Sequence, residues 1–165
     1  RQVLQISKNV SRADIYSMDV VRILKGMIEK YNISTEYIEI EITESAYVEN
    51  GSVIKDTEKA FKNAGFKILI DDFGSGYSVL NTIVDIPVDV IKIDRGFITS
   101  CLETDRGIYF LKHLIDMIRN LGYQIICEGV ETDEQIEILR QIGCDEIQGY
   151  WYSKPLKMEM SLIHI

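Results

Sequence analysis

The sequence predicts an α/β fold in which a parallel sheet or barrel is built from alternating strands and helices. Short apolar runs typical of buried strands alternate along the chain with longer segments whose apolar residues have helical spacing. Residues 63–71, 120–128 and 141–148 also share one pattern: a helix end, a glycine, a short strand and then a polar residue. Such repeated helix-to-strand units are typical of parallel sheets.

Composition is consistent with one globular domain over residues 1–165. The hydrophobic content of 46% allows a sizeable core, and the formal net charge of −8 argues against a nucleic-acid polymer or an anionic membrane surface as partner. No apolar run approaches the ~18 residues of a membrane helix. The three cysteines are too scattered for a disulfide framework or a zinc site. With no visible signal peptide, we expect a cytoplasmic protein.

The first half of the chain is predicted to alternate three strands with two helices. Residues 3–7 are rich in apolar side chains, and residues 37–43 alternate isoleucine with glutamate or threonine, which is the two-residue period of a strand. Residues 67–70 form a third, short apolar run. Residues 19–31 and 53–64 carry apolar side chains at helical spacing, and a glycine follows the second of these helices as its stop.

The second half is predicted to alternate in the same way. Pro87 breaks the chain before a strand, Gly122 and Gly143 each follow a helix, and Thr132 with Gln135 forms the pattern of a capping box at a helix start. The predicted elements are a helical turn, three strands and two helices, at residues 78–83, 88–93, 105–121, 123–127, 132–142 and 146–151.

Polar side chains recur where the predicted strands end. In a parallel sheet or barrel these carboxyl ends share one rim, and functional sites form there. Lys92 and Asp94 also lie on one face of their strand, opposite Ile91 and Ile93, so the lysine needs an interior partner. A salt bridge to Asp94 is one alternative for that partner. The rim residues are Asn9, Glu41, Asp71, Asp72, Lys92, Asp94, Glu128 and Gln148.

The pair Asp71-Asp72 is the most unusual feature of this rim. Two adjacent carboxylates at the edge of an apolar core are costly unless a cation compensates them. Gly74 and Gly76 follow, and they allow backbone angles or close approaches that other residues do not. An Asx-type turn after a strand is the alternative reading of this pair.

Four carboxylates beside one lysine favour bound divalent cations. Oxygen ligands of this type suit Mg²⁺ or Mn²⁺, and adjacent Asp71 and Asp72 could bind two ions with one carboxylate bridging. Paired ions promote in-line phosphoryl displacement, in which Lys92 could orient the attacking water or stabilise charge on phosphorus oxygens. Proton abstraction of the enolase type, with a lysine and one or two Mg²⁺, is an alternative that spacing alone leaves open.

The sequence resembles the EAL-domain family of bacterial cyclic-di-GMP phosphodiesterases. Six motifs in the family's order carry the resemblance and cover nearly the whole chain. They are Asn9-Val-Ser11, Glu41-Ile-Thr-Glu44, Asp71-Asp-Phe-Gly-Ser-Gly-Tyr-Ser78, Pro87-Val-Asp-Val-Ile-Lys-Ile-Asp94, Glu128-Gly-Val-Glu-Thr132 and Gln148-Gly-Tyr-Trp-Tyr-Ser-Lys-Pro-Leu156.

The resemblance implies a TIM-type (β/α) barrel and hydrolysis of cyclic di-GMP to linear pGpG with two Mg²⁺ or Mn²⁺ ions. It implies that Asn9, Glu41 and Asp71 hold the first ion, and that Asp71 bridges to a second ion held with Asp72 and Glu128. Lys92, Glu128 and Gln148 would be the catalytic residues, with Lys92 and Gln148 contacting the attacking water.

Further residues are implied to bind substrate or support loops, and a homodimer is expected from the same resemblance. Glu44 would brace the glycine loop that contains Gly74 and Gly76, and Pro155 would lie near the guanine pocket. Asp94 and Glu131 complete this group.

The chain departs from the family pattern upstream of Asn9. The Glu-Ala-Leu motif strand, whose glutamate would bind the first ion, is absent from this sequence. About six strands are predicted where a closed barrel has eight, so we expect an incomplete barrel that is weak or inactive alone. An alternative is a degenerate EAL-type domain that binds cyclic di-GMP or a protein partner as a receptor or scaffold.

Overall fold

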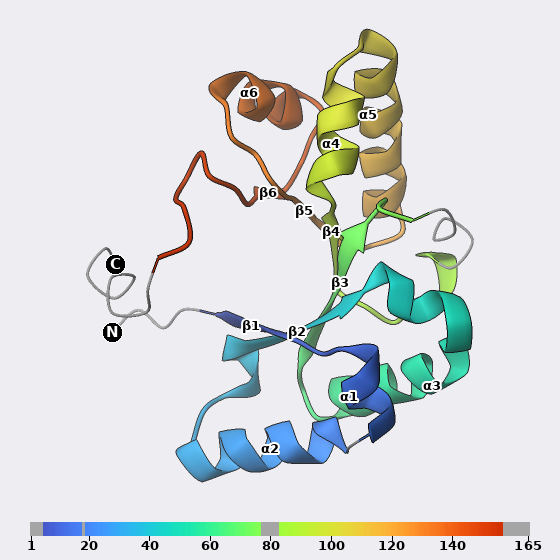
Figure 1. Ribbon diagram of the computed structural model, residues 1–165, viewed down its shortest axis with the longest axis vertical. Helices are drawn as coiled ribbons and strands as arrows, with labels where there is room; N and C mark the ends of the chain where they lie inside the picture. The colour runs from blue at the N-terminus through green and yellow to red at the C-terminus, as the bar shows by residue number, and fades with distance from the viewer. Residues whose placement is uncertain (1–4, 18, 77–82, 157–165) are drawn as a thin grey trace.

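A single parallel sheet of six strands, arranged in chain order, organises the fold (Figure 1). The computed structural model describes residues 5–17, 19–76 and 83–156. Every neighbouring pair of strands is parallel, which confirms the predicted α/β class. The strands are β1 (Ile6–Asn9), β2 (Ile38–Thr43), β3 (Lys67–Phe73), β4 (Val90–Ile93), β5 (Gln124–Cys127) and β6 (Glu146–Ile147).

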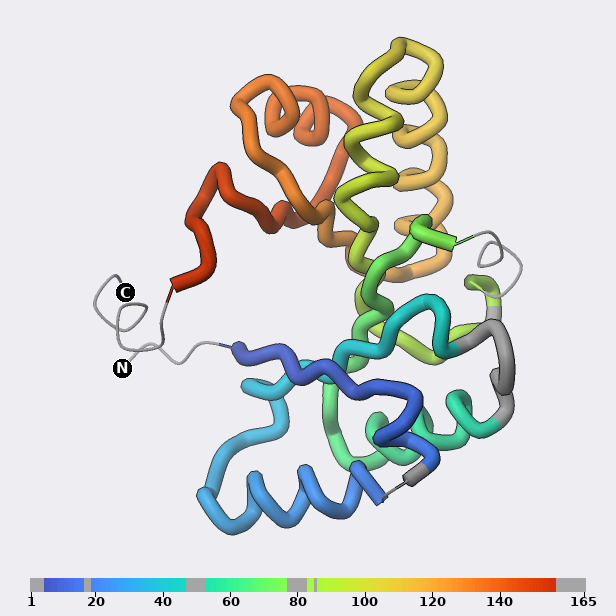
Figure 2. Tube along the Cα trace, in the orientation of Figure 1, coloured from blue at the N-terminus to red at the C-terminus, as the bar shows by residue number. Residues whose placement is uncertain are grey.

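The sheet is curved, and its helices follow its outer side as in half of a (β/α) barrel (Figure 1). The chain passes around this arc in order from the blue end to the red end, without crossing back (Figure 2). The helices are α1 (Arg12–Ser17), α2 (Val20–Tyr31), α3 (Glu44–Asn63), α4 (Arg95–Leu102), α5 (Asp105–Asn120) and α6 (Asp133–Gln141), with short 3₁₀ helices at Thr35–Tyr37 and Ile83–Asp85.

The two faces of the sheet differ in chemistry. Ile40, Ile68 and Ile91 belong to the main apolar core with residues of the helices, as the alternation in residues 37–43 predicts. Glu41 and Leu69 are neighbours in register and are also buried, but they face the inner side of the curved sheet. The central strands β2, β3 and β4 are therefore largely buried on both faces, and their charged side chains lie on the inner one.

Several predicted boundaries are wrong. Helix α3 begins at Glu44, directly after β2, rather than at residue 53. Strand β1 spans Ile6–Asn9 and so extends past the predicted end at residue 7, while residues 3 and 4 of that prediction lie outside the described residues. Strand β3 continues through Phe73, and β6 ends at Ile147. Helices α1 and α4 were not predicted at all. The predicted helical turn at residues 78–83 lies outside the described residues except for Ile83, which begins a 3₁₀ helix.

None of the helices in the described ranges has both the length and the apolar character needed to cross a membrane.

Candidate metal and catalytic site

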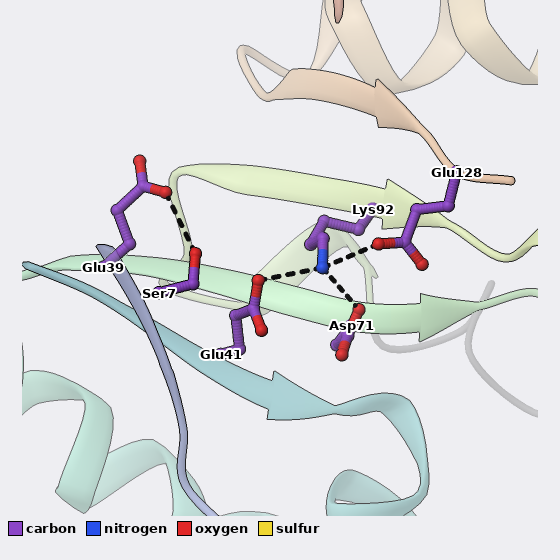
Figure 3. Close-up of polar contacts among 6 residues, drawn as sticks. All are labelled: Ser7, Glu39, Glu41, Asp71, Lys92 and Glu128. Atoms are coloured by element: carbon purple, nitrogen blue, oxygen red, sulfur yellow. Dashed lines mark hydrogen bonds and ion pairs between the residues drawn. The ribbon is translucent and has the colours of Figure 1, made fainter. Parts of the chain in front are cut away.

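The side chain of Lys92 is the centre of a charged cluster on the inner face of the sheet (Figure 3). Its Nζ atom lies 2.8 Å from Glu41 Oε1, 3.0 Å from Asp71 Oδ1 and 2.7 Å from Glu128 Oε1. The partners come from β2 and β3 and from the residue after β5, so adjacent strands meet at one lysine. Only 6% of the Lys92 side chain is exposed to solvent. The interior partner predicted for Lys92 therefore consists of three carboxylates.

The Asp71 carboxylate is not fully satisfied by this lysine. Its Oδ1 atom forms the 3.0 Å ion pair with Lys92, yet it is buried and accepts no hydrogen bond. A buried carboxylate oxygen without a hydrogen bond is costly, because it has lost water and gained only a charge contact. A cation bound to this oxygen would remove the cost.

A β-bulge brings Asp72 to the same rim as Asp71. Ile70 pairs with Ile91 and Phe73 with Ile93, so three steps along β3 match only two along β4. Asp72 is the residue with left-handed backbone here, with φ of 57°. Consecutive side chains of a regular strand point to opposite faces, and the bulge suspends this rule at the aspartate pair.

Asp71, Asp72 and Glu128 together form a candidate cation site. One oxygen from each carboxylate lies within 4.8 Å of the others. Oxygen atoms are the ligands that Mg²⁺, Mn²⁺ and Ca²⁺ prefer in proteins. The donor set and the unsatisfied Asp71 oxygen both fit a hard divalent cation.

The electrostatics of the cluster follow from burial and crowding. Burial raises the pKa of Glu128, and the neighbouring Lys92 offsets only part of this effect. Partial burial and the adjacent Asp71 charge raise the pKa of Asp72. Both shifts mean that the protein alone holds more negative charge here than it can stabilise. A bound cation would favour the ionised form of each carboxylate.

Lys92 remains charged despite its burial. Burial disfavours the ammonium, but its contacts with Glu128, Glu41 and Asp71 outweigh that effect and hold the pKa of Lys92 above its ordinary value. A lysine held in its charged form by three carboxylates can orient a water or stabilise an anion. It is poorly suited to be the base that abstracts a proton. The enolase-type alternative is therefore disfavoured by this geometry.

The neutral residues of the predicted rim lie at the two edges of the sheet. Asn9 ends β1, is exposed, and is the register partner of Glu41. Gln148 directly follows β6, and its backbone N–H donates to the Cys127 carbonyl oxygen at 2.9 Å. Its side chain is exposed, and together with Pro155 it lines a hollow of about 420 Å³ formed by the C-terminal segment.

Glu44 contacts the glycine loop that follows the aspartate pair. Its Oε2 atom accepts a hydrogen bond from the Gly74 N–H at 2.7 Å, and its carboxylate is buried. A Cβ atom added at Gly76 would lie 2.8 Å from Glu44 Oε1. Burial raises the pKa of Glu44, and the hydrogen bonds from Gly74 and Gly76 counteract part of this shift. The side chain holds the first part of the loop against β2.

Asp94 caps a helix rather than joining the cluster. Its Oδ1 atom accepts a hydrogen bond from the Phe97 N–H at 3.0 Å at the start of α4, and its backbone N–H donates to the Phe73 carbonyl oxygen. Its position at the end of β4, beside the aspartate pair, matches the predicted rim. The predicted salt bridge between Lys92 and Asp94 is not the one that forms, since Lys92 pairs with Glu41, Asp71 and Glu128.

Two residues beside the site were not predicted. The Arg95 guanidinium pairs with Glu131 Oε1 at 2.9 Å, and its aliphatic stem contacts Gly129 so closely that no Cβ atom would fit there. The ring of Phe97 lies 2.8 Å from the position of a Cβ atom at Gly74. Arg95 could have been identified from the sequence, because it is a charged residue directly after the rim residue Asp94. Nothing in the sequence distinguished Phe97.

Comparison with known proteins gives one family. A model of the EAL domain matches residues 1–155. The chain is 30% identical over 155 residues to the cyclic di-GMP phosphodiesterase NbdA of Pseudomonas aeruginosa, covering 94% of this chain and 20% of that protein. The chain spans about a fifth of the length of this and other curated relatives that it matches.

Solved structures match the fold as well. The EAL enzyme Bd1971, bound to cAMP and cyclic di-GMP, superposes with a TM-score of 0.90 at 30% identity, covering 98% of this chain and 43% of that one. The Klebsiella pneumoniae protein BlrP1, solved with manganese and cyclic di-GMP, superposes with a TM-score of 0.85 at 28% identity, covering 92% and 39%.

Proposed function

Because the chain belongs to the EAL domain family, we propose that the protein containing it hydrolyses cyclic di-GMP to linear pGpG by a two-metal mechanism. The observation that carries this proposal is the group of carboxylates around Lys92, with Asp72 beside them at the carboxyl ends of the strands. A phosphodiesterase named for this substrate is among the relatives. The bacterial cytoplasm is where we expect it to act.

The residues that would hold the two Mg²⁺ or Mn²⁺ ions follow from the cluster. Asp71, Asp72 and Glu128 would hold one ion, and Asn9, Glu41 and Asp71 the other, with Asp71 common to both. The unsatisfied Oδ1 atom of Asp71 and the oxygen-only donor set support this assignment. When bound, divalent ions supply Lewis-acid polarisation of phosphoryl oxygens and activation of a water nucleophile.

The chain's own side chains would position the reacting groups. The Lys92 ammonium, whose charged form the carboxylates favour, would donate a hydrogen bond to the attacking water and stabilise negative charge on the phosphorus oxygens. Gln148, on the opposite side of β5, would contact the same water through its amide. Glu128, held 2.7 Å from Lys92, would keep the ammonium directed at this point.

Other predicted residues would act through these groups. Glu44 would fix the loop of Gly74 and Gly76 through the hydrogen bond to the Gly74 N–H. Asp94 and Glu131 would support the rim through the α4 cap and the Arg95 pair. Pro155 would border the part of the site that receives a guanine base, and the domain would work as a homodimer.

Incubation of the full-length protein with Mn²⁺ and cyclic di-GMP tests the proposal. The expected result is pGpG as the product, with no product in EDTA and none from Asp71→Asn. A matched control is Lys67→Met, which removes a lysine of the same inner face outside the cluster and should leave hydrolysis unchanged. Retention of full activity in Asp71→Asn would exclude the assigned site.

A second candidate function is a receptor or scaffold that binds cyclic di-GMP or a protein without hydrolysis. One observation favours it: Lys92 already places one cation among Glu41, Asp71 and Glu128 without any metal ion. In the same assay a receptor would bind cyclic di-GMP, measured by calorimetry, and release no pGpG over extended incubation.

A further inference from the structure

Two cysteines that are distant in sequence meet beside the candidate site. Cys127 ends β5 and is buried, and Cys144 lies after α6 and is half-buried. Their Sγ atoms are 3.0 Å apart. A disulfide bond has an S–S length of ~2.05 Å, so a closure of about 1 Å would join them.

The backbone holds both thiols in this position. The Cys127 carbonyl oxygen accepts the N–H of Gln148 at 2.9 Å, which ties β5 to the segment after β6. The Cys144 N–H donates to the Leu139 carbonyl oxygen at 3.0 Å, which fixes the turn after α6. The two sulfur atoms therefore meet because sheet pairing and a helix end place them together, and neither lies on a long loop.

The two thiols have different roles available to them. In the neutral pair the single proton of the Cys144 thiol can be donated to Cys127 Sγ or to the Glu146 carbonyl oxygen, each 3.0 Å away. When Cys144 loses this proton, the Cys127 thiol can donate to the thiolate, which lowers the pKa of Cys144 although burial opposes the shift. Cys144 is also the more accessible of the two. A reactive thiol combines accessibility with a stabilised thiolate.

We propose that Cys127 and Cys144 are a modification site that a peroxide converts to an intramolecular disulfide. Cys144 sulfur attacks one peroxide oxygen, the O–O bond breaks, and Cys144 becomes a sulfenic acid with release of one water from hydrogen peroxide. Cys127 sulfur then attacks the Cys144 sulfur, and the hydroxyl leaves as a second water with the Cys127 proton. The two thiols lose two electrons in total, and the peroxide gains them.

The third cysteine provides a matched control. Cys101 is buried on α4 and is not part of the pair. Burial raises the pKa of its thiol, which disfavours reaction with a peroxide. The site is independent of the proposed hydrolysis, because neither sulfur atom needs metal or nucleotide to be where it is.

Peptide mapping of the full-length protein tests the inference. The reduced protein is treated with hydrogen peroxide, free thiols are blocked with iodoacetamide, and trypsin is added without reductant. Arg140 lies between the two cysteines, so trypsin separates them unless a disulfide joins their peptides. The expected result is a linked peptide pair two hydrogens lighter than the separate peptides, lost on treatment with dithiothreitol.

Variants make the result specific. Cys101→Ser should retain the linked pair, and Cys144→Ser should abolish it while circular dichroism shows a folded protein. If Cys144→Ser does not fold, the wild-type linked pair and its retention in Cys101→Ser carry the test. Peptides that stay separate after peroxide, or a link that involves Cys101, would overturn the inference. So would linked peptides found only in covalent dimers on a non-reducing gel.

Discussion

The inner face of the sheet carries charged side chains at two levels, and the two levels are built differently. Two residues before Glu41 on β2, Glu39 pairs with Lys67 Nζ at 3.0 Å. Glu39 also accepts a 3.4 Å hydrogen bond from Ser7 (Figure 3). One acid there meets one base, and the side chains of Lys67 and Glu39 are 31% and 11% exposed. At the carboxyl ends, three carboxylates share Lys92, whose side chain is 6% exposed.

The difference separates a structural ion pair from a prepared site. The Glu39–Lys67 pair is balanced in charge and its lysine is partly hydrated, so it has little capacity for a further cation. The Lys92 cluster has excess negative charge, little water and one carboxylate oxygen without a hydrogen bond. Charge excess in a place of low hydration is what a divalent cation can relieve.

Removal of the two lysines should give the largest contrast. Lys92→Met leaves Glu41, Asp71 and Glu128 buried together without a counter-charge, and the free energy of unfolding in EDTA should fall by about 3–5 kcal/mol. Lys67→Met should cost less, about 1–2 kcal/mol, because only one carboxylate, that of Glu39, loses its counter-charge. Urea denaturation measures both. Equal losses in the two variants would show that the two levels do not differ as described.

The second-largest difference between the Lys92 cluster and the Glu39–Lys67 pair should appear in the rate of hydrolysis. Asp71→Asn should lower kcat/KM for cyclic di-GMP by at least about a hundredfold, because even indirect supports of a metal site typically contribute 10–100-fold. Glu39→Gln should leave kcat/KM unchanged. Steady-state kinetics in Mn²⁺ measures both, and a comparable loss in Glu39→Gln would remove the distinction between site and structural pair.

Metal binding should stabilise the protein through the carboxylates around Lys92 and not through the Glu39–Lys67 pair. Mn²⁺ at a hundred times its Kd should add about 2.7 kcal/mol to stability, a rise in Tm of roughly 5–10 °C. Glu128→Gln, which removes one carboxylate of the candidate cation site, should reduce this rise, and Glu39→Gln should preserve it. Thermal melts with and without Mn²⁺ provide the measurement. If Mn²⁺ raised the Tm of Glu128→Gln as much as that of the wild type, the ion would have to bind at another site.

The smallest effect should come from Ser7. Its hydrogen bond to Glu39 is 3.4 Å long and involves an exposed strand, so Ser7→Ala should change the free energy of unfolding by less than about 0.5 kcal/mol. Chemical denaturation beside wild type is sufficient. A larger loss would mean that the Glu39 level depends on this bond more than its geometry indicates.

The sequence predicted the parallel sheet and its inner-face lysine because both rest on local patterns. Alternation in residues 37–43 placed Glu41 opposite the isoleucines of β2, and parity placed Lys92 on an inner face that needed partners. The prediction that distant residues lie together then followed from one rule, that the carboxyl ends of parallel strands lie along the same edge of a sheet. The rule could say which side chains share a rim but not which of them touch.

The missed helices show where local patterns fail. In α1 the Ser11 Oγ and Asp14 carboxylate exchange hydrogen bonds with the backbone N–H groups of each other, a capping-box signal that was present in the sequence. In α4, Gly96 and Thr99 are weak helix formers, and the helix depends on the Asp94 cap and on packing of Ile98 in the core. Asp94 was interpreted only as a rim carboxylate.

Other features depend on contacts across the fold. Helix α3 begins at Glu44 although Asn50 and Gly51 disfavour helix, and the buried Glu44 carboxylate bonds to the Gly74 loop. Two residues after strand β6, Gly149 lies against the Val130 backbone, where no Cβ atom would fit. No sequence pattern signals either approach.

The left-handed backbone of Asp72 sets a narrow substitution spectrum at that position. Asparagine and glycine tolerate a φ of 57°, whereas glutamate keeps the charge but lacks the short polar side chain that lets aspartate and asparagine offset the Cβ clash by local hydrogen bonding. Selection for folding alone would accept Asp, Asn and Gly there. Selection for a tightly bound divalent cation would favour a charged carboxylate over the neutral asparagine and glycine. Aspartate meets both requirements best, so the bulge makes it the preferred residue at this position.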